Sequence, residues 1–183
     1  MHSPEDVLTF WSEAGRGRWF RRDDALDQRF RERFEVAHFA ASRRELESWM
    51  ASASGALALV ILLDQFPRNC FRRSAHAYAT DPLARHYADR ALAAGFDAEV
   101  DPELCIFFIL PFQHSEDLSD QERALTLARA CGDEHIIDAC QRHLDVIARF
   151  GRFPHRNPEL GRATRPEEQA YLDAGGGFIP KPY

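Results

Sequence analysis

Eight consecutive apolar residues, Ala56 to Leu63, constrain the fold of this 183-residue chain more than any other feature. The run leaves no polar face at either helical or strand periodicity, and an element of that kind is buried on all sides. It ends in Asp64 and Gln65, directly ahead of a Phe-Pro pair, and a proline disfavours helical geometry for the residue before it. We therefore expect a central buried helix that ends at Gln65.

A carboxylate at the end of that helix needs a nearby cation. The C-terminus of a helix carries partial negative charge, so Asp64 is electrostatically unfavourable there unless a positive group compensates it. Arg68 and Arg72 follow Asp64 at four and eight residues. The spacing predicts a paired charge site at the end of the central helix.

Length and composition are those of one globular domain over 1–183, with residues 175–183 as an extended C-terminal tail. A hydrophobic content of 45% with 11% aromatic residues supplies enough apolar surface for a sizeable core. The net charge of -6 argues against a general nucleic-acid-binding protein, because such domains usually carry a basic excess. Nucleic acid is therefore an unlikely partner.

The cysteines and the N-terminal segment point to a cytoplasmic protein. Four cysteines occur without the CxxC spacing of a metal or redox site, which favours reduced structural thiols. Residues 1–10 lack the basic start and apolar run of a secretion signal. The uncharged stretch 49–63 is shorter than the roughly 20 residues that span a membrane.

Apolar spacing and capping residues predict helices along the whole chain, and no segment has a strand pattern. Pro4–Glu13 reads as a short first helix. Residues 23–42 and 133–150 each carry one apolar stripe. On the second of these stripes His143 is expected as a hydrogen-bonded residue at the edge of the core. Further helices are expected from Asp81 to Gly95, from Asp101 to Leu110 with Pro111 as its end, from Ser119 to Ala130 with a Ser119 and Glu122 capping box, and over Pro166–Asp173. The fold class is all-α, an antiparallel array of about eight or nine helices, arranged as a bundle or as a superhelix of helix pairs.

The segment from Arg16 to Arg22 places arginines on both sides of a Trp-Phe pair. Such a loop can stack on and pair with an anion. It can also tuck both aromatic rings under the first helices, which is the interpretation we favour.

Three polar segments each follow a strongly apolar helix: residues 64–69, 111–117 and 151–157. If the intervening helices are single and antiparallel, the helices ending at Gln65, Leu110 and Phe150 point the same way, and their C-terminal ends meet. The segments would then form one mixed-charge cluster of nine predicted binding residues: Asp64, Gln65, Arg68, His114, Glu116, Arg152, His155, Arg156 and Asn157.

Two interpretations of this cluster stay open. Arginines recognise carboxylates and phosphates, and His or Glu can handle a proton, so the cluster can form a binding pocket for a small anion. The same side chains can instead supply donors to the carbonyl groups at three helix ends, as a structural network.

An enzyme is the alternative, namely a hydrolase with His114 and His155 as acid and base and Asp64 or Glu116 orienting one of them. A metal-assisted version would use the same four residues, but their spacing matches no local metal motif, so no metal or other cofactor is predicted. No nucleophile elbow, HExxH, P-loop or dinucleotide fingerprint is present. Sequence reasoning therefore leaves open whether the protein is an enzyme, and it does not determine the oligomeric state.

The motifs LLDQFPRNCFR, ATDPLA, LPFQHSED, FGRFPHRN and LGRATRPEE, with the pairs Phe10-Trp11 and Trp19-Phe20, span almost the whole chain. In these motifs the chain resembles the bacterial family catalogued as domain of unknown function 924. The resemblance implies an all-helical fold like the tetratricopeptide superhelix, without an established activity or catalytic residues. A fold of that kind implies, by analogy, a protein or peptide partner, so that a peptide terminus joins the small anion as an expected ligand.

Overall fold

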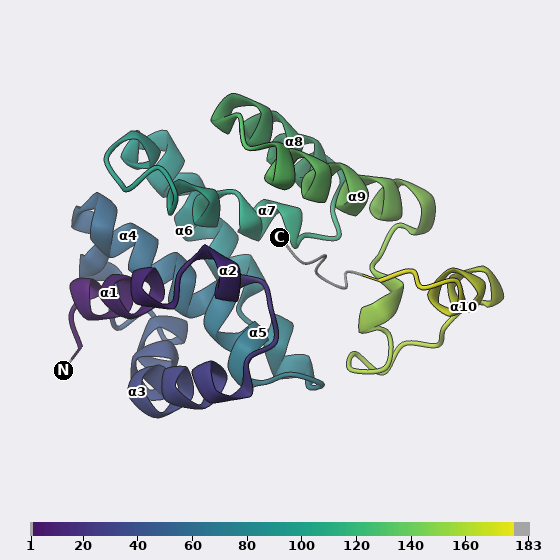
Figure 1. Ribbon diagram of the computed structural model, residues 1–183, viewed down its shortest axis with the longest axis horizontal. Helices are drawn as coiled ribbons and strands as arrows, with labels where there is room; N and C mark the ends of the chain where they lie inside the picture. The colour runs from purple at the N-terminus through teal and green to yellow at the C-terminus, as the bar shows by residue number, and fades with distance from the viewer. Residues whose placement is uncertain (1, 178–183) are drawn as a thin grey trace. The chain divides into compact units, whose positions relative to one another are not determined.

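The computed structural model describes residues 2–177, and every regular element in that range is helical (Figure 1). No strand occurs among these residues, which confirms the all-α prediction. The α-helices are α1 (Pro4–Ala14), α2 (Arg16–Trp19), α3 (Asp24–Ser42), α4 (Ala53–Val60), α5 (Phe66–Cys70), α6 (Asp81–Ala93), α7 (Leu110–Gln113), α8 (Leu118–Cys131), α9 (Glu134–Phe150) and α10 (Pro166–Asp173). Shorter turns are η1 (Glu47–Ala51), η3 (Ala75–Tyr78), η4 (Phe96–Ala98), η5 (Cys105–Phe108) and η6 (Pro154–Arg156), and η2 (Ile61–Gln65) is a π-helical segment.

Two compact units make up the chain. The first unit holds the residues up to Arg72 together with His76–Pro111, and the second holds Arg73–Ala75 together with the residues from Phe112 onward. Each is described below by itself, and the single domain expected over 1–183 stays a prediction. Of the predicted tail, residues 178–183 lie outside the described part of the chain.

The apolar run forms the centre of the first unit. Every side chain from Ala56 to Leu63 is 0% exposed, which confirms the prediction that this element is buried on all sides. Helices α1 and α6 and the turn η1 pack against α4. At Gly55 a Cβ atom would lie 2.0 Å from the Trp49 carbonyl oxygen, so only glycine lets η1 approach α4 this closely.

The aromatic rings of the first loop are also part of this core. Trp19 is buried, and its indole Nε1 donates to the Trp11 carbonyl oxygen at 2.7 Å. The Phe107 ring lies 5.1 Å from the Trp19 ring and 6.1 Å from the Phe20 ring, measured between centroids. The favoured interpretation, in which this loop tucks its two aromatic rings under the first helices, is confirmed for Trp19, which is buried against Trp11 of α1. Phe20 is half-buried and packs on Phe107 of η5.

The predicted end of the central helix at Gln65 is wrong, because the chain continues through η2 into α5. A proline ring inside an α-helix clashes with the carbonyl group four residues earlier, which for Pro67 is that of Leu63. The π-turn adds one residue to the hydrogen-bonded ring, so that the Phe66 N–H donates to the Ile61 carbonyl oxygen five residues back. The helix therefore passes its proline without ending.

Side chains bind the carbonyl groups in this π-helical segment. The Thr80 hydroxyl donates to the Leu63 carbonyl oxygen at 2.6 Å, and His38 Nδ1 donates to the Leu62 carbonyl oxygen at 2.8 Å. His38 Nε2, the remaining ring nitrogen, faces His76 Nε2 at 3.2 Å. Burial lowers the pKa of His38, so the neutral ring is the favoured form there.

The predicted helix from Asp101 to Leu110 is also wrong. The Asp101 carboxylate accepts from the Glu103 N–H at 2.8 Å, which stabilises a turn, and a 3-10 turn, η5, follows. Pro111 is then the second residue of α7 instead of the end of a helix. The first turn of a helix tolerates proline, because an N–H there has no partner within the helix.

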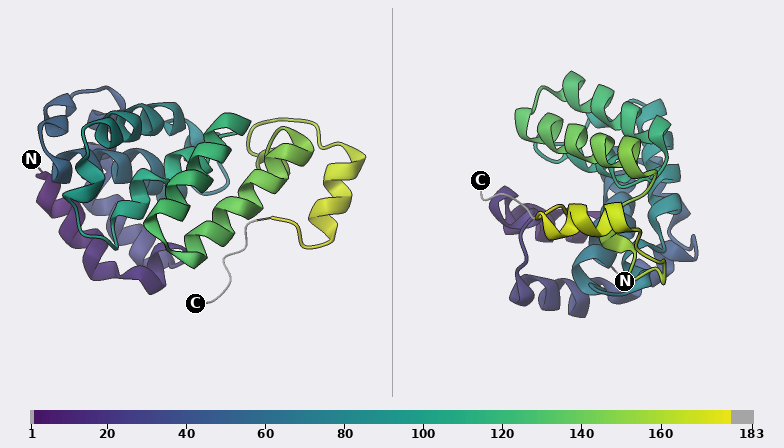
Figure 2. Two further views of the ribbon diagram at one scale, coloured as in Figure 1. Left: turned by 90° about the horizontal axis from the view of Figure 1, so that it is seen from above. Right: turned by 90° about the vertical axis from the view of Figure 1, so that its right-hand side faces the viewer.

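Helices α8 and α9 lie side by side and antiparallel in the second unit (Figures 1 and 2). Gly132 turns the chain between them with φ 76°, and the Asp133 carboxylate caps α9, so the predicted helix over 133–150 is confirmed. Asp117 caps α8 by accepting from the Ser119 N–H at 2.8 Å, and the predicted Ser119 and Glu122 box is therefore wrong. Side chains of this unit pack into one cluster: Val146, Ile147, Phe150, Phe153 and Tyr171.

None of the helices in the described range 2–177 has the length and hydropathy needed to cross a bilayer.

Candidate functional site

The nine sequence-predicted residues divide between the two units. Asp64, Gln65 and Arg68 belong to the first unit. The other six belong to the second: His114, Glu116, Arg152, His155, Arg156 and Asn157. Their gathering into one cluster therefore stays a prediction, although its premise, a helix end at both Gln65 and Leu110, is wrong.

Arg68 is the centre of a buried ion network in the first unit. Its guanidinium donates to both carboxylate oxygens of Asp81 at 2.8 and 2.9 Å, and its Nη1 lies 3.1 Å from Asp64 Oδ1. The Asp64 and Asp81 side chains are only 1% and 7% exposed. Burial by itself would lower the pKa of Arg68, but these two carboxylates outweigh it and raise that pKa. Asp81 serves here as an ion partner instead of the helix cap that its sequence position predicts.

Asp64 also accepts from the neighbouring amide, since Gln65 Nε2 lies 2.6 Å from its Oδ2. The prediction that Arg72 compensates Asp64 is wrong. Arg72 donates to Asp27 Oδ2 at 2.9 Å, and Asn69 donates to the other oxygen of Asp27 at 2.7 Å. Asn69 and Arg72 therefore tie α5 and the residues that follow it to Asp27 of α3.

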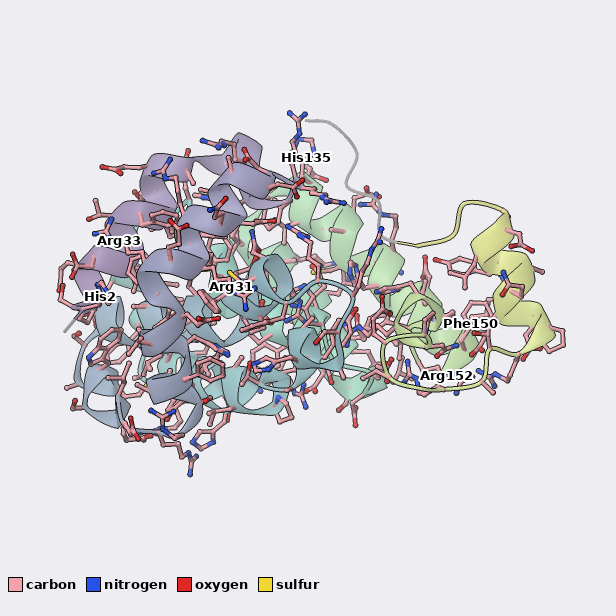
Figure 3. All side chains as sticks on the ribbon, turned by 90° about the horizontal axis from the view of Figure 1, so that it is seen from below. His2, Arg31, Arg33, His135, Phe150 and Arg152 are labelled. Atoms are coloured by element: carbon pink, nitrogen blue, oxygen red, sulfur yellow. The ribbon has the colours of Figure 1, made fainter. Side chains whose placement is uncertain are left out.

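A second buried carboxylate, Glu168, organises the C-terminal part of the second unit and is 0% exposed. Arg152 donates to its two oxygens at 2.7 and 2.8 Å, and Arg165 donates to it through both its backbone N–H and its guanidinium. Asn157 Nδ2 donates to it at 3.1 Å. Figure 3 shows Arg152 next to Phe150, close to α10. The hydrogen bonds from Arg152 and then Arg165 hold the pKa of Glu168 well below its usual range.

Glu116 is engaged in the same way. Arg162 donates to its two oxygens at 2.7 and 3.0 Å, and the Phe153 N–H donates to its Oε1 at 2.7 Å. Burial would raise the pKa of Glu116, but these hydrogen bonds outweigh it and lower the pKa. Glu116, Arg152 and Asn157 thus each bind a charged side chain that is distant in the sequence.

Of the remaining three predicted residues, His155 and Arg156 lie beside the buried ring of Phe153, and His114 lies beside His143, which also contacts that ring. We call this set the Phe153 cluster. The Arg156 guanidinium carbon lies 4.5 Å from the centre of the Phe153 ring, and Arg156 Nη2 donates to the His114 carbonyl oxygen at 2.9 Å. The rings of His143 and His155 each lie 5.6 Å from Phe153, and the ring of His114 lies 6.3 Å from His143.

His143 is the buried base of the Phe153 cluster, in agreement with its predicted place at the edge of the core. Its Nδ1 donates to the Ala139 carbonyl oxygen at 2.7 Å, and its Nε2 faces Gln113 Nε2 at 3.4 Å. Burial lowers the pKa of His143 well below its ordinary value, and the charges of His114, Arg156 and His155 lower it further.

The Phe153 cluster brings together a guanidinium and imidazole rings, which are side chains suited to the recognition of anions. Cys140, behind His143, donates its thiol to Gln113 Oε1 at 3.0 Å, and burial raises the pKa of that thiol to about 12, so it is no thiolate nucleophile at neutral pH. Among residues 2–177, no group of three or more His, Cys, Asp or Glu side chains is placed to hold a metal ion.

Sequence reasoning missed several residues of these networks. Asp81, Arg162, Arg165 and Glu168 each hold a predicted residue or its partner in place. Two signals were available, because Asp81 lies in ATDPLA and the other three lie in LGRATRPEE. Phe153 lies in FGRFPHRN, so a signal of the same kind was available for it. His143 gave no such signal, since a ring on an apolar face is the ordinary mark of a core residue.

Comparison with known proteins identifies relatives but no activity. A family model described as a bacterial protein of unknown function (DUF924) matches residues 7–176. A solved structure, that of the protein of unknown function ATU0120 from Agrobacterium tumefaciens, has a TM-score of 0.91 and 50% sequence identity, with 94% of this chain and 97% of that chain covered. No curated protein matches the chain.

Proposed function

The chain belongs to the DUF924 family of bacterial proteins of unknown function, and from that premise we propose that it is a ligand-binding module whose Phe153 cluster binds a small anion. The group recognised is a carboxylate or a phosphate, carried either by a free small molecule or by the C-terminus of a peptide. The observation that carries the proposal is the placement of one guanidinium and two imidazoles around a single buried ring, with the imidazole of His114 next to that of His143.

Charge supports this choice of ligand. Arg156 keeps its positive charge at any physiological pH, and the imidazoles of His114 and His155 can supply further N–H donors. The carboxylate of Glu116 is engaged by Arg162 and by the Phe153 N–H. An anion at the cluster therefore gains charge-assisted hydrogen bonds from donors that the fold already holds in place.

The geometry supports binding in preference to catalysis. The Cys140 thiol is held by Gln113, and both oxygens of Glu116 are held by donors, so neither group is poised to attack a substrate. The hydrolytic alternative with His114 and His155 stays a prediction of the sequence.

The tetratricopeptide-like arrangement and the cytoplasmic location belong to the same proposal. The antiparallel pair α8 and α9 is a unit of the kind that such superhelices stack. The four cysteines, all within the described residues, form no disulfide, which agrees with a reducing compartment. A peptide partner would be recognised by its terminal carboxylate.

Thermal unfolding with added ligands tests the proposal. Acetate, inorganic phosphate, a short peptide with a free C-terminus and the same peptide amidated are compared at one ionic strength. A ligand at 100 times its Kd stabilises a protein by about 2.7 kcal/mol, which raises the Tm of a chain of this size by roughly 5 to 10 °C. We expect such a rise with at least one of the first three and none with the amidated peptide.

Variants show whether the Phe153 cluster is responsible. Arg156→Gln, or His155→Gln if the first variant folds poorly, should abolish the ligand-induced rise. Arg149→Gln is the matched control, because it removes an exposed guanidinium that lies 4.6 Å from the Phe150 ring, outside the cluster. The proposal would be overturned if the cluster variant, Arg156→Gln or His155→Gln, showed the same rise in Tm as Arg149→Gln. It would also be overturned if no anion raised the Tm of the parent protein.

A further inference from the structure

The segment that links α1 to α3 encloses a surface hollow of about 180 Å³. Its walls are Gly17, Arg18, Arg21, Arg22 and Asp23, so three of its five residues are arginines. It belongs to the first unit, whereas the Phe153 cluster belongs to the second, and an inference about it is independent of the function proposed above.

The fold explains the aromatic half of this segment but not its arginines. Trp19 is 4% exposed and is fixed by its hydrogen bond to the Trp11 carbonyl oxygen, and Phe20 packs on Phe107. Anchoring these two rings leaves Arg18, Arg21 and Arg22 exposed at the surface. The core therefore holds the backbone of the hollow rigidly and leaves its charged side chains in contact with solvent.

The carboxylates beside the hollow are already engaged. Asp23 Oδ2 accepts from Arg18 at 2.8 Å, while Asp23 Oδ1 accepts from the Leu26 N–H at 3.0 Å and so caps α3. Asp24 accepts from Arg22 at 2.7 and 3.2 Å. These ion pairs position Arg18 and Arg22, and part of the donor capacity of each guanidinium remains for a ligand.

Arg21 is the residue that these pairs do not use. It is exposed, and its guanidinium makes no hydrogen bond or ion pair within the described residues 2–177. The three arginines outnumber the two carboxylates, and the N-terminus of the 19-residue helix α3 adds partial positive charge at the same place. The hollow is therefore electropositive, and its volume suits a phosphate-sized group.

We propose that this hollow is a binding site for a phosphate group, either as inorganic phosphate or as the phosphate of a small monoester. Arg21 would make the direct contact, because a guanidinium presents paired N–H donors that match the oxygens of a phosphate. Arg18 and Arg22, held by Asp23 and Asp24, would supply the surrounding positive charge. Among residues 2–177, no carboxylate pairs with Arg21, and this distinguishes it from its two neighbours.

The test follows the arginine side-chain Nε–Hε resonances by ¹H–¹⁵N NMR while the intact protein is titrated at constant ionic strength. Inorganic phosphate and glycerol phosphate are the two phosphate probes, and sodium chloride is the reference. We expect saturable movement of the Arg21 resonance with at least one phosphate probe and none with chloride. Saturation by both probes would identify the phosphate group itself as the ligand, and saturation by glycerol phosphate alone would identify a monoester.

Arg21→Gln should weaken phosphate binding about tenfold, the effect of losing about 1.4 kcal/mol of charge-assisted interaction. The residue is exposed, so the variant should fold. Arg29→Gln is the matched control: Arg29 is an exposed arginine on α3 that lies 5.5 Å from the Phe10 ring and outside this hollow. Unchanged affinity in Arg21→Gln, equal losses in both variants, or shifts that follow chloride as well as phosphate would overturn the proposal.

Discussion

Replacing Arg68 by alanine tests whether the polar residues after the central apolar run stabilise the fold or bind a ligand. The side chain of Arg68 is 17% exposed and contacts two carboxylates that are almost fully buried. Arg68→Ala would leave both negative charges in the protein interior without their shared cation. Removing one partner from a buried ion pair costs about 3 to 5 kcal/mol.

That loss is large beside the 5 to 15 kcal/mol that is typical of a whole domain. For a chain of this size it corresponds to a fall in Tm of roughly 6 to 20 °C. Urea unfolding monitored by circular dichroism at 25 °C gives the free energy directly, and an unchanged m-value would confirm that the variant unfolds as the parent does.

The matched control is Arg142→Ala on α9. Arg142 pairs with Asp138 at the same i,i+4 spacing that separates Arg68 from Asp64. Both side chains of this pair are exposed, Arg142 at 42% and Asp138 at 62%. The expected loss there is about 0.5 kcal/mol or less. If Arg68→Ala also lost less than about 1 kcal/mol, the network would not be structural, and Arg68 would return to the list of ligand-binding candidates.

Three further predictions concern stability. Gly55→Ala should lower the free energy of unfolding by about 1 to 3 kcal/mol, although alanine is the better helix former, because its Cβ would meet the Trp49 carbonyl oxygen; an unchanged urea midpoint would contradict that close approach. The pKa of Glu168 is lowered in the folded state, so its contribution to the free energy of unfolding is complete above the unfolded-state pKa of about 4.3 and is lost as the pH falls below it. Thermal melts of Glu168→Gln from about pH 6 to pH 3 should therefore show less acid destabilisation than those of the parent. The pKa of His143 is lowered by burial, so its neutral form stabilises the protein above about pH 6.5 and that stability is lost on acidification. The free energies of unfolding in urea at about pH 7.5 and pH 5.5 should therefore differ less in His143→Gln than in the parent. An equal difference in both proteins would show that His143 does not titrate with unfolding.

The helical class and the position of the core follow from local patterns that do not depend on tertiary context. The apolar run from Ala56 to Leu63 has no polar side to expose, and it is fully buried. Helix α9 has one apolar face, and it is capped by the Asp133 carboxylate at its N-terminus and by Gly151 at its C-terminus. Such signals act within a few residues of chain, so they can be read from sequence.

The errors lie where a distant side chain competes with the local rule. Pro67 ends a helix by the local rule, yet the chain passes it through a π-turn whose neighbouring carbonyl oxygens accept from His38 and Thr80, which lie 24 and 17 residues away from their partners. Asp81 has the sequence context of a helix cap, yet it binds Arg68 thirteen residues earlier. A partner at that separation leaves no trace in local spacing.

The same distinction divides the candidate sites. Residue types by themselves determined which side chains are suited to charge and proton chemistry, and the sequence named His114, His155 and Arg156 on that basis. Only the tertiary structure decided that Arg152, Asn157 and Glu116 are held by the carboxylate or guanidinium of a distant residue. It also decided that His155 and Arg156 lie against Phe153, while His114 lies beside His143. The physical reason is that a charged side chain in a folded protein binds whichever opposite charge the packing of the core brings within 3 Å, and that packing is a property of the whole chain.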